Sequence, residues 1–328
     1  MNQALKGVLT TGLLAACTWG GGVAQAASEG PAPMPKVMTL VVPFSPGGSN
    51  DVFARELGAR LSKALGNTVV VENKAGAGGT IGTGDVARAA PDGSRLLFTS
   101  VSFTTKAGVE TSLPYDPIKS FAPVALVARG GMMLVAKPES PYRTLDAFVT
   151  ALKDPSQQIN YGSAGIGSIG QMAMESLGAE VRAKPLHIPY QGITNAVTDM
   201  IGNRLDTMIT TPASVSGALQ GKQIRAIAMT SAEKSPFFPD LPVIADAVPG
   251  FSVEAWWGVF APAKTPPAVV DKLNAAINAV SQDPAMRELF AREATEPSSL
   301  TPAQFAAYVD REVTRWKTLS KTRDIKIE

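Results

Sequence analysis

The sequence predicts an α/β fold of two lobes, each a doubly wound sheet with helices on both faces. Short runs rich in β-branched residues, such as 39–42 and 68–72, alternate with stretches of helical periodicity. This alternation is typical of parallel strands joined by right-handed crossovers. It is interrupted at 121–136, where two apolar runs surround Gly130 and Gly131, and it resumes afterwards. We therefore expect 121–136 to carry the chain into a second lobe.

The first lobe is expected to contain three strands before this crossing. Pro43 ends the first strand, and Asn50 or Asp51 can cap the helix that follows. The apolar run 254–262 is expected to pair with the crossing segment and to return the chain to the first lobe. This organisation gives a domain of residues 36–128 and 226–328 and a domain of residues 129–225. The expected strands are 39–42, 68–72, 95–100, 159–162, 185–189, 205–209 and 224–230, and the expected helices are 51–65, 81–90, 145–153, 169–177, 193–201, 213–220, 268–281, 284–293 and 303–322.

Length and charge narrow the class of protein. With 328 residues the chain is long enough for two domains with buried cores. Its 30 Lys and Arg residues nearly balance 28 Asp and Glu residues, and no basic run is present. A nucleic-acid partner is therefore not expected.

The first 27 residues have the pattern of a secretory signal peptide. A short apolar run follows Lys6, and Ala24-Gln25-Ala26 is a small-x-small cleavage site. A second interpretation is a lipoprotein processing site at Leu14-Ala15-Ala16-Cys17, which would leave a lipid on Cys17. Either route exports the body of the protein to the periplasm. Cys17 is the only cysteine, so its removal would leave no disulfide and no thiolate metal site.

Residues for catalysis are scarce. His187 is the only histidine, and in the apolar strand 185–189 we expect it to be packed or hydrogen-bonded. No Gly-x-Ser-x-Gly elbow, Walker motif or metal-ligand spacing is found, so we expect no catalytic residue, metal or cofactor. The alternative is a secreted hydrolase or isomerase of organic acids that uses Ser163, Ser168 or His187.

Three glycine-rich turns, at 46–49, 76–79 and 163–168, each follow an expected strand and precede an expected helix. In doubly wound sheets such turns lie at the carboxyl ends of the strands, where ligands bind. Free backbone N–H groups at a helix N-terminus suit a carboxylate or another anion. The first turn alone is also compatible with an ordinary βα connection. Its repetition on both lobes favours a site for a small anion.

These turns carry a family resemblance. The segments VVPFSPGGSND (41–51) and VVVENKAGAGG (69–79) resemble Bug-type proteins, the extracytoplasmic solute receptors of tripartite tricarboxylate transporters. The resemblance covers nearly all of the mature chain. It implies a type II periplasmic-binding-protein fold, with two domains joined by two crossing strands and closing on the ligand. The other matching segments are APDG (90–93), NYGSAGIGS (160–168), PYQG (189–192), IRAIAMTS (224–231) and AWWGVFAP (255–262).

The resemblance also implies a ligand and partners. The ligand would be a small organic carboxylate, whether aliphatic, amino acid or aromatic, and the monomeric receptor would pass it to the membrane components of the transporter. Many relatives carry Asp or Asn near the end of the strand after Asp206, where this chain has Thr210 and Thr211. We expect that corner to be uncharged, so no preference for an amino group is transferred. The ligand-binding residues implied are Phe44, Ser45, Gly47, Gly48, Ser49, Asp51, Ala77, Ser100, Ser163, Ala164, Gly165, Gly167, Ser168 and Tyr190.

Overall fold

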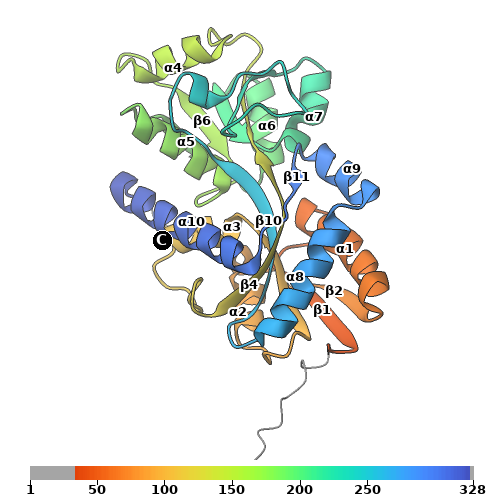
Figure 1. Ribbon diagram of the computed structural model, residues 1–328. Helices are drawn as coiled ribbons and strands as arrows, with labels where there is room; N and C mark the ends of the chain where they lie inside the picture. The colour runs from red at the N-terminus through yellow and green to blue at the C-terminus, as the bar shows by residue number, and fades with distance from the viewer. Residues whose placement is uncertain (1–33, 326–328) are drawn as a thin grey trace, which may run out of the picture. The chain divides into compact units, whose positions relative to one another are not determined.

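The computed structural model describes residues 34–325 and has an α/β fold with two mixed sheets (Figure 1). The expected signal peptide and Cys17 lie outside the described residues. The first sheet has six strands in the order β11-β4-β10-β3-β1-β2, and the second has five in the order β7-β6-β8-β5-β9. The strands are β1 (Val37–Val42), β2 (Thr68–Asn73), β3 (Arg95–Ser100), β4 (Phe121–Gly131), β5 (Met133–Ala136), β6 (Asn160–Ser163), β7 (Leu186–Pro189), β8 (Thr207–Thr210), β9 (Arg225–Met229), β10 (Glu254–Pro262) and β11 (Glu296–Pro297).

Parallel strands form the part of each sheet that carries the glycine-rich turns. Strand β1 pairs in parallel with β2 and β3, and β6 pairs in parallel with β7 and β8. The carboxyl ends of such strands meet at one edge of their sheet, so the turns that follow them are neighbours. The sheets are mixed because β10 runs antiparallel to β3 and β4, and β5 runs antiparallel to β8 and β9.

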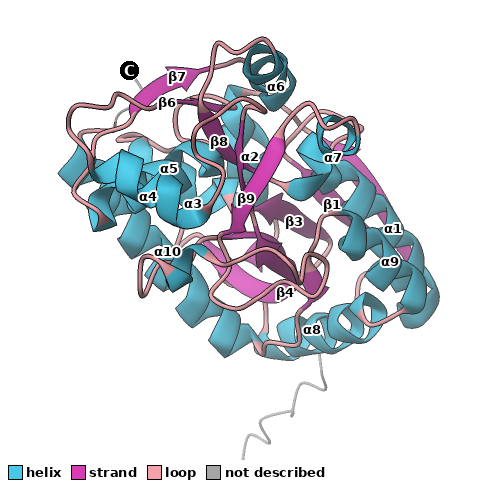
Figure 2. Cartoon of the chain, turned by 90° about the horizontal axis from the view of Figure 1, so that it is seen from above, coloured by secondary structure: helices cyan, strands magenta, loops and turns pink. Residues whose placement is uncertain are grey.

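Helices cover both faces of the first sheet, and alternate strand residues belong to different apolar clusters. Leu40 and Trp257 lie in the cluster that includes α1 and α8 residues, whereas Val41 and Trp256 lie in the cluster that includes α3 and α10 residues. Helices α1, α8 and α9 line one side of the sheet in Figure 2. The helices are α1 (Ser49–Leu65), α2 (Thr80–Ala87), α3 (Ser102–Val109), α4 (Leu145–Lys153), α5 (Ile169–Glu180), α6 (Ile193–Ile201), α7 (Pro212–Gln220), α8 (Pro267–Ser281), α9 (Pro284–Arg292) and α10 (Pro302–Arg323).

The chain changes sheets between β4 and β5 and returns between β9 and β10. Figure 1 shows β4 and β10 side by side over much of their length. We expected Gly130 and Gly131 to interrupt the crossing segment, but both belong to β4 because β10 pairs with them, and the break falls at Met132. A Cβ on Gly130 would lie 2.8 Å from Thr295 Cα, so only glycine permits this approach of two backbones.

Three local expectations need correction. Helix α1 begins at Ser49 after an N-cap at Gly48, two residues before the expected start, because the glycine turn leads directly into helical geometry. Helix α2 ends at Ala87 instead of residue 90. Helix α3 was not expected, because serine and threonine are weak helix formers. Burial of side chains such as Phe103 and Val109 stabilises it.

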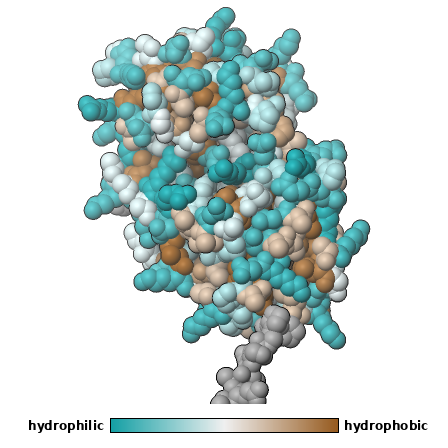
Figure 3. Space-filling model, viewed as in Figure 1, coloured by the Kyte–Doolittle hydropathy of each residue, from teal (hydrophilic) through white to brown (hydrophobic). Residues whose placement is uncertain are grey.

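None of the helices in the described part of the chain is long and apolar enough to cross a membrane. On the face seen in Figure 3, hydrophilic side chains predominate and the hydrophobic ones occur in small, separate patches.

Candidate ligand-binding site

The first glycine-rich turn presents free backbone donors at the start of α1. Its N-cap, Gly48, has no side chain to satisfy them, and the N–H groups of Gly48, Ser49 and Asn50 have no partner among residues 34–325. Gly47 has φ +93°, a left-handed conformation that favours glycine. The turn therefore offers a cluster of N–H groups at the positive end of a 17-residue helix, an arrangement suited to an anion.

Asp51 holds this turn in place. Its carboxylate accepts hydrogen bonds from Gly47 N at 3.0 Å and Asn73 Nδ2 at 2.9 Å, and it pairs with Arg55 at 2.9 Å. The residue is only 5% exposed. Burial raises the pKa of Asp51, but the bonds from Arg55, Gly47 and Asn73 outweigh burial and hold the pKa below its usual value. Asp51 therefore stabilises the turn, and Arg55 neutralises the charge of its carboxylate.

The second turn lies against the first. It forms a short 3-10 helix, Ala77–Gly79, in which Ala77 has φ +48°. A Cβ on Gly79 would touch the ring of Phe44 at 3.4 Å, so Phe44 packs directly over this turn. At the end of β3, Ser100 Oγ lies 3.0 Å from Ser102 Oγ.

Lys106 is a cation at this turn that the sequence reasoning missed. It lies on α3, is paired with Glu110, and its side chain is 14% exposed. Its Nζ would lie 2.7 Å from a Cβ on Gly78, so the glycine lets the ammonium approach the turn. No sequence signal pointed to it, because the helix that carries it was not expected.

The third turn is built around Ser163 and the start of α5. Ser168 caps α5 by accepting a hydrogen bond from Gln171 N at 3.5 Å, and Gly167 N donates to Gln171 Oε1 at 2.7 Å. Gly165 and Gly167 have φ +118° and +78°. The side chain of Gln171 thereby fixes the turn, and Ala164 lies within it.

Buried Ser163 and half-buried His187 form a hydrogen-bonded pair. Ser163 Oγ lies 2.7 Å from His187 Nε2 and also exchanges hydrogen bonds with the backbone of Gly165 at 3.0 and 3.1 Å. Ser163 is 0% exposed, and the His187 ring stacks on Tyr161 with centroids 4.9 Å apart. Burial lowers the pKa of His187, and the charge of Glu175 opposes this. The expectation that His187 is packed and hydrogen-bonded is confirmed.

Tyr190 joins the same corner. Its backbone N–H donates to Ser163 O at 3.1 Å, and its hydroxyl donates to Asp199 Oδ2 at 2.8 Å. Burial, reinforced by Asp199, raises the pKa of Tyr190 to about 12. The structure thus brings Tyr190 together with Ser163 and Gly165, while Phe44, Gly47 and Ala77 gather on the first sheet.

The corner at Thr210 and Thr211 contains a carboxyl group that we did not expect. The carboxyl group of Glu293 comes close enough for the Thr211 hydroxyl to affect its pKa, and Glu293 Oε1 accepts a hydrogen bond from Ser49 Oγ. Burial raises the pKa of Glu293, and the hydroxyls of Ser49 and Thr211 offset this only in part. No local pattern could predict the contact, because Glu293 lies far along the chain at the end of α9.

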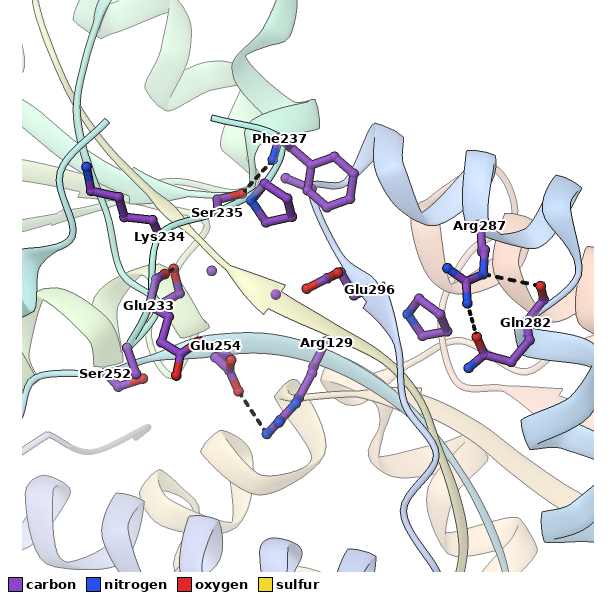
Figure 4. Close-up of a pocket in the computed structure, with 17 residues that line it drawn as sticks. Arg129, Glu233, Lys234, Ser235, Phe237, Ser252, Glu254, Gln282, Arg287 and Glu296 are labelled. Atoms are coloured by element: carbon purple, nitrogen blue, oxygen red, sulfur yellow. Dashed lines mark hydrogen bonds and ion pairs between the residues drawn. The ribbon is translucent and has the colours of Figure 1, made fainter. Parts of the chain in front are cut away.

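Two well-formed cavities lie away from the three turns. One, of about 580 Å³, lies where β4 and β10 start to diverge, and there Arg129 faces Glu254 at 3.4 Å (Figure 4). Burial raises the pKa of Glu254, and Arg129 opposes the shift. The other, of about 870 Å³, is lined by residues 107–117 and part of α10. No residue of the three turns lines either cavity, so neither cavity is the site that the sequence predicts.

Comparisons with known proteins agree with the fold. The sequence profile of the tripartite tricarboxylate transporter family receptor matches residues 53–325. The periplasmic binding protein BugD is 34% identical with a TM-score of 0.73, and the alignment covers 89% of this chain and 98% of BugD. MatC from Rhodopseudomonas palustris with bound malate is 31% identical with a TM-score of 0.72, covering 86% of this chain and 98% of MatC. R. palustris Rpa4515 with adipate is 29% identical with a TM-score of 0.76, covering 88% and 98%.

Proposed function

The chain belongs to the tripartite tricarboxylate transporter receptor family, and from this premise we propose that it is a periplasmic receptor for a small organic carboxylate. The observation that carries the proposal is the set of unpartnered N–H groups of Gly48, Ser49 and Asn50 at the start of α1. Two relatives with the same fold have malate and adipate bound, and both ligands are dicarboxylates. A ligand carboxylate would take the place of water at these N–H groups.

The second half of the site would come from the other sheet. The turn 163–168 leaves the N–H groups of Ile169 and Gly170 at the start of α5 without partners among the described residues. The domain of residues 36–128 and 226–328 and the domain of residues 129–225 would close on the ligand about β4 and β10. The chain leaves the first sheet after Gly131, at the break between β4 and β5. The closed receptor would then pass the acid to membrane components of a transporter.

The free energy required is modest. A micromolar dissociation constant corresponds to about 8 kcal/mol. Hydrogen bonds to a charged group contribute roughly 1.5–3 kcal/mol each, so four or five of them suffice once ordering costs are met. Neutral N–H donors can therefore hold the acid without a dedicated arginine.

Binding without turnover is the interpretation we favour over a hydrolase. The Ser163–His187 contact has the distance of a nucleophile–base pair, but Ser163 is fully buried and its hydroxyl is held by the backbone of Gly165. The contact is better suited to fixing the turn than to attacking a substrate.

The test is a thermal-shift panel of carboxylates on the mature protein, followed by a turnover assay on each acid that stabilises it. An acid at one hundred times its dissociation constant should add about 2.7 kcal/mol of stability, a shift of several degrees. Stabilisation without product supports the receptor. Product that forms with the wild type and not with Ser168→Ala would establish the enzyme instead.

A further inference from the structure

Glu293 places a buried carboxyl group at the first turn of α1. It is the residue after α9, it is 9% exposed, and its Oε1 accepts a hydrogen bond from Ser49 Oγ. Ser49 is the first residue of α1 and belongs to the turn that would bind the ligand carboxylate. The carboxyl group therefore lies next to the proposed site while belonging to a distant part of the chain.

The backbone around Glu293 is fixed on both sides. Thr295 donates to Phe290 O through its N–H at 3.1 Å and through its hydroxyl at 3.0 Å. Strand β11 then pairs with β4, and the Ala294–Thr295 backbone lies so close to Gly130 that no side chain fits there. The position of the carboxyl group is thus set by the fold and does not depend on a flexible loop.

One oxygen of this group has no donor. Glu293 Oε2 is buried and makes no hydrogen bond with any residue in 34–325. The Thr211 hydroxyl is near enough to lower the pKa of Glu293, but it makes no hydrogen bond with Oε2 and lies 2.8 Å from Ser214 Oγ. Asn50 Oδ1, in the residue after Ser49, is also buried without a partner among the described residues. A buried acceptor without a donor costs about 1–3 kcal/mol, and more when it is charged. Two acceptors without donors, Glu293 Oε2 and Asn50 Oδ1, therefore lie near the free N–H groups of the first turn.

We propose that Glu293 determines ligand specificity: its Oε2 accepts a hydrogen bond from a hydroxyl or ammonium group carried by the bound acid. The inference rests on the proposed function, because the ligand carboxylate must lie at the N–H groups of Gly48 to Asn50. A donor one or two carbons from that carboxylate would then face Glu293. The receptor would take hydroxy- or amino-substituted acids in preference to the unsubstituted acids of the same skeleton.

The test is isothermal titration with matched acids. The three sets are propionate, lactate and alanine; succinate, malate and aspartate; and glutarate, 2-hydroxyglutarate and glutamate. A hydrogen bond to a charged group predicts that, in the set that binds, a substituted acid binds about tenfold or more tightly than the unsubstituted one. In Glu293→Ala this ratio should fall below about threefold, in Glu293→Gln it should lie between, and Glu288→Ala, on the exposed part of α9, should leave it unchanged.

Each outcome separates the two proposals. If substituted and unsubstituted acids bind the wild type equally well, the role of Glu293 is refuted and the receptor function stands. A ratio that survives in Glu293→Ala refutes it as well, provided that circular dichroism shows a native fold. If no carboxylate binds at all, the proposed function itself is overturned, and the role of Glu293 with it.

Discussion

Replacing Asp51, which holds the first turn, should lower both the free energy of unfolding and the affinity for the ligand. In Asp51→Ala, the carboxylate that holds Gly47 N, Asn73 Nδ2 and Arg55 is lost. Each bond to a charged group contributes roughly 1.5–3 kcal/mol, but the freed donors regain water in part, so the expected loss is about 2–4 kcal/mol. For a chain of this size that corresponds to a fall in Tm of about 5–10 °C.

The same variant makes a prediction about pH. The folded pKa of Asp51 lies below the unfolded value of about 3.9, so its contribution is fully present above that value. As the pH falls through the folded pKa, the carboxylate takes up a proton and the contribution is lost. The difference in free energy of unfolding between wild type and Asp51→Ala should therefore be constant near neutral pH and shrink below pH about 4.

Urea unfolding at several pH values measures this difference, and calorimetry with an acid that binds the wild type measures the effect on the site. The matched control is Asp271→Asn, at an exposed position of α8. A stability within about 0.5 kcal/mol of wild type, together with unchanged affinity, would show that the turn holds its shape without Asp51.

Three further changes test other parts of the structure. Gly130→Ala should cost about 1–3 kcal/mol in urea unfolding, because its Cβ would lie 2.8 Å from Thr295 Cα, whereas Gly217→Ala, with open space around it, should be neutral or stabilising. Gly47→Val, at φ +93°, should cost about 1–2 kcal/mol while the fold survives, and should abolish calorimetric binding; unchanged affinity would mean that this turn is only structural. Arg323→Ala should cost about 3 kcal/mol, since it removes the guanidinium 2.9 Å from the Glu175 carboxylate, whose side chain is 12% exposed and retains the hydrogen bond from Tyr161. Arg292→Ala, in an exposed pair, should change little, and equal effects of the two changes would contradict the argument.

Most of the fold could be predicted from local pattern. The alternation of β-branched runs and amphipathic stretches gave β1 to β3 and their order along the chain, because buried parallel strands need apolar residues on both faces. The helix expected at 303–322 is α10, and its start is capped by Thr301 together with Gln304. Such signals involve residues a few positions apart, so they are visible before the chain folds.

The parts that escaped prediction depend on contacts distant in sequence. Strand β11 has only two residues and exists because β4 is next to it. The carboxyl group at the Thr211 corner belongs to Glu293, which no motif connects to Ser49. Lys106 approaches the second turn only because Gly78 has no side chain in its way. In each case tertiary packing, and not a local pattern, brought the residues together.

The charges around the turns explain how recognition could be divided between them. Arg55 and Lys106, the cations placed beside the first two turns, are already paired with Asp51 and Glu110. An acid bound there would meet backbone N–H dipoles, which recognise any carboxylate equally well. Selection among acids must then come from groups that contact the rest of the ligand, and a buried carboxyl oxygen without a donor is such a group. Backbone N–H groups that hold the carboxylate, combined with a side chain such as Glu293 that contacts the rest of the ligand, would therefore divide recognition between affinity and selectivity.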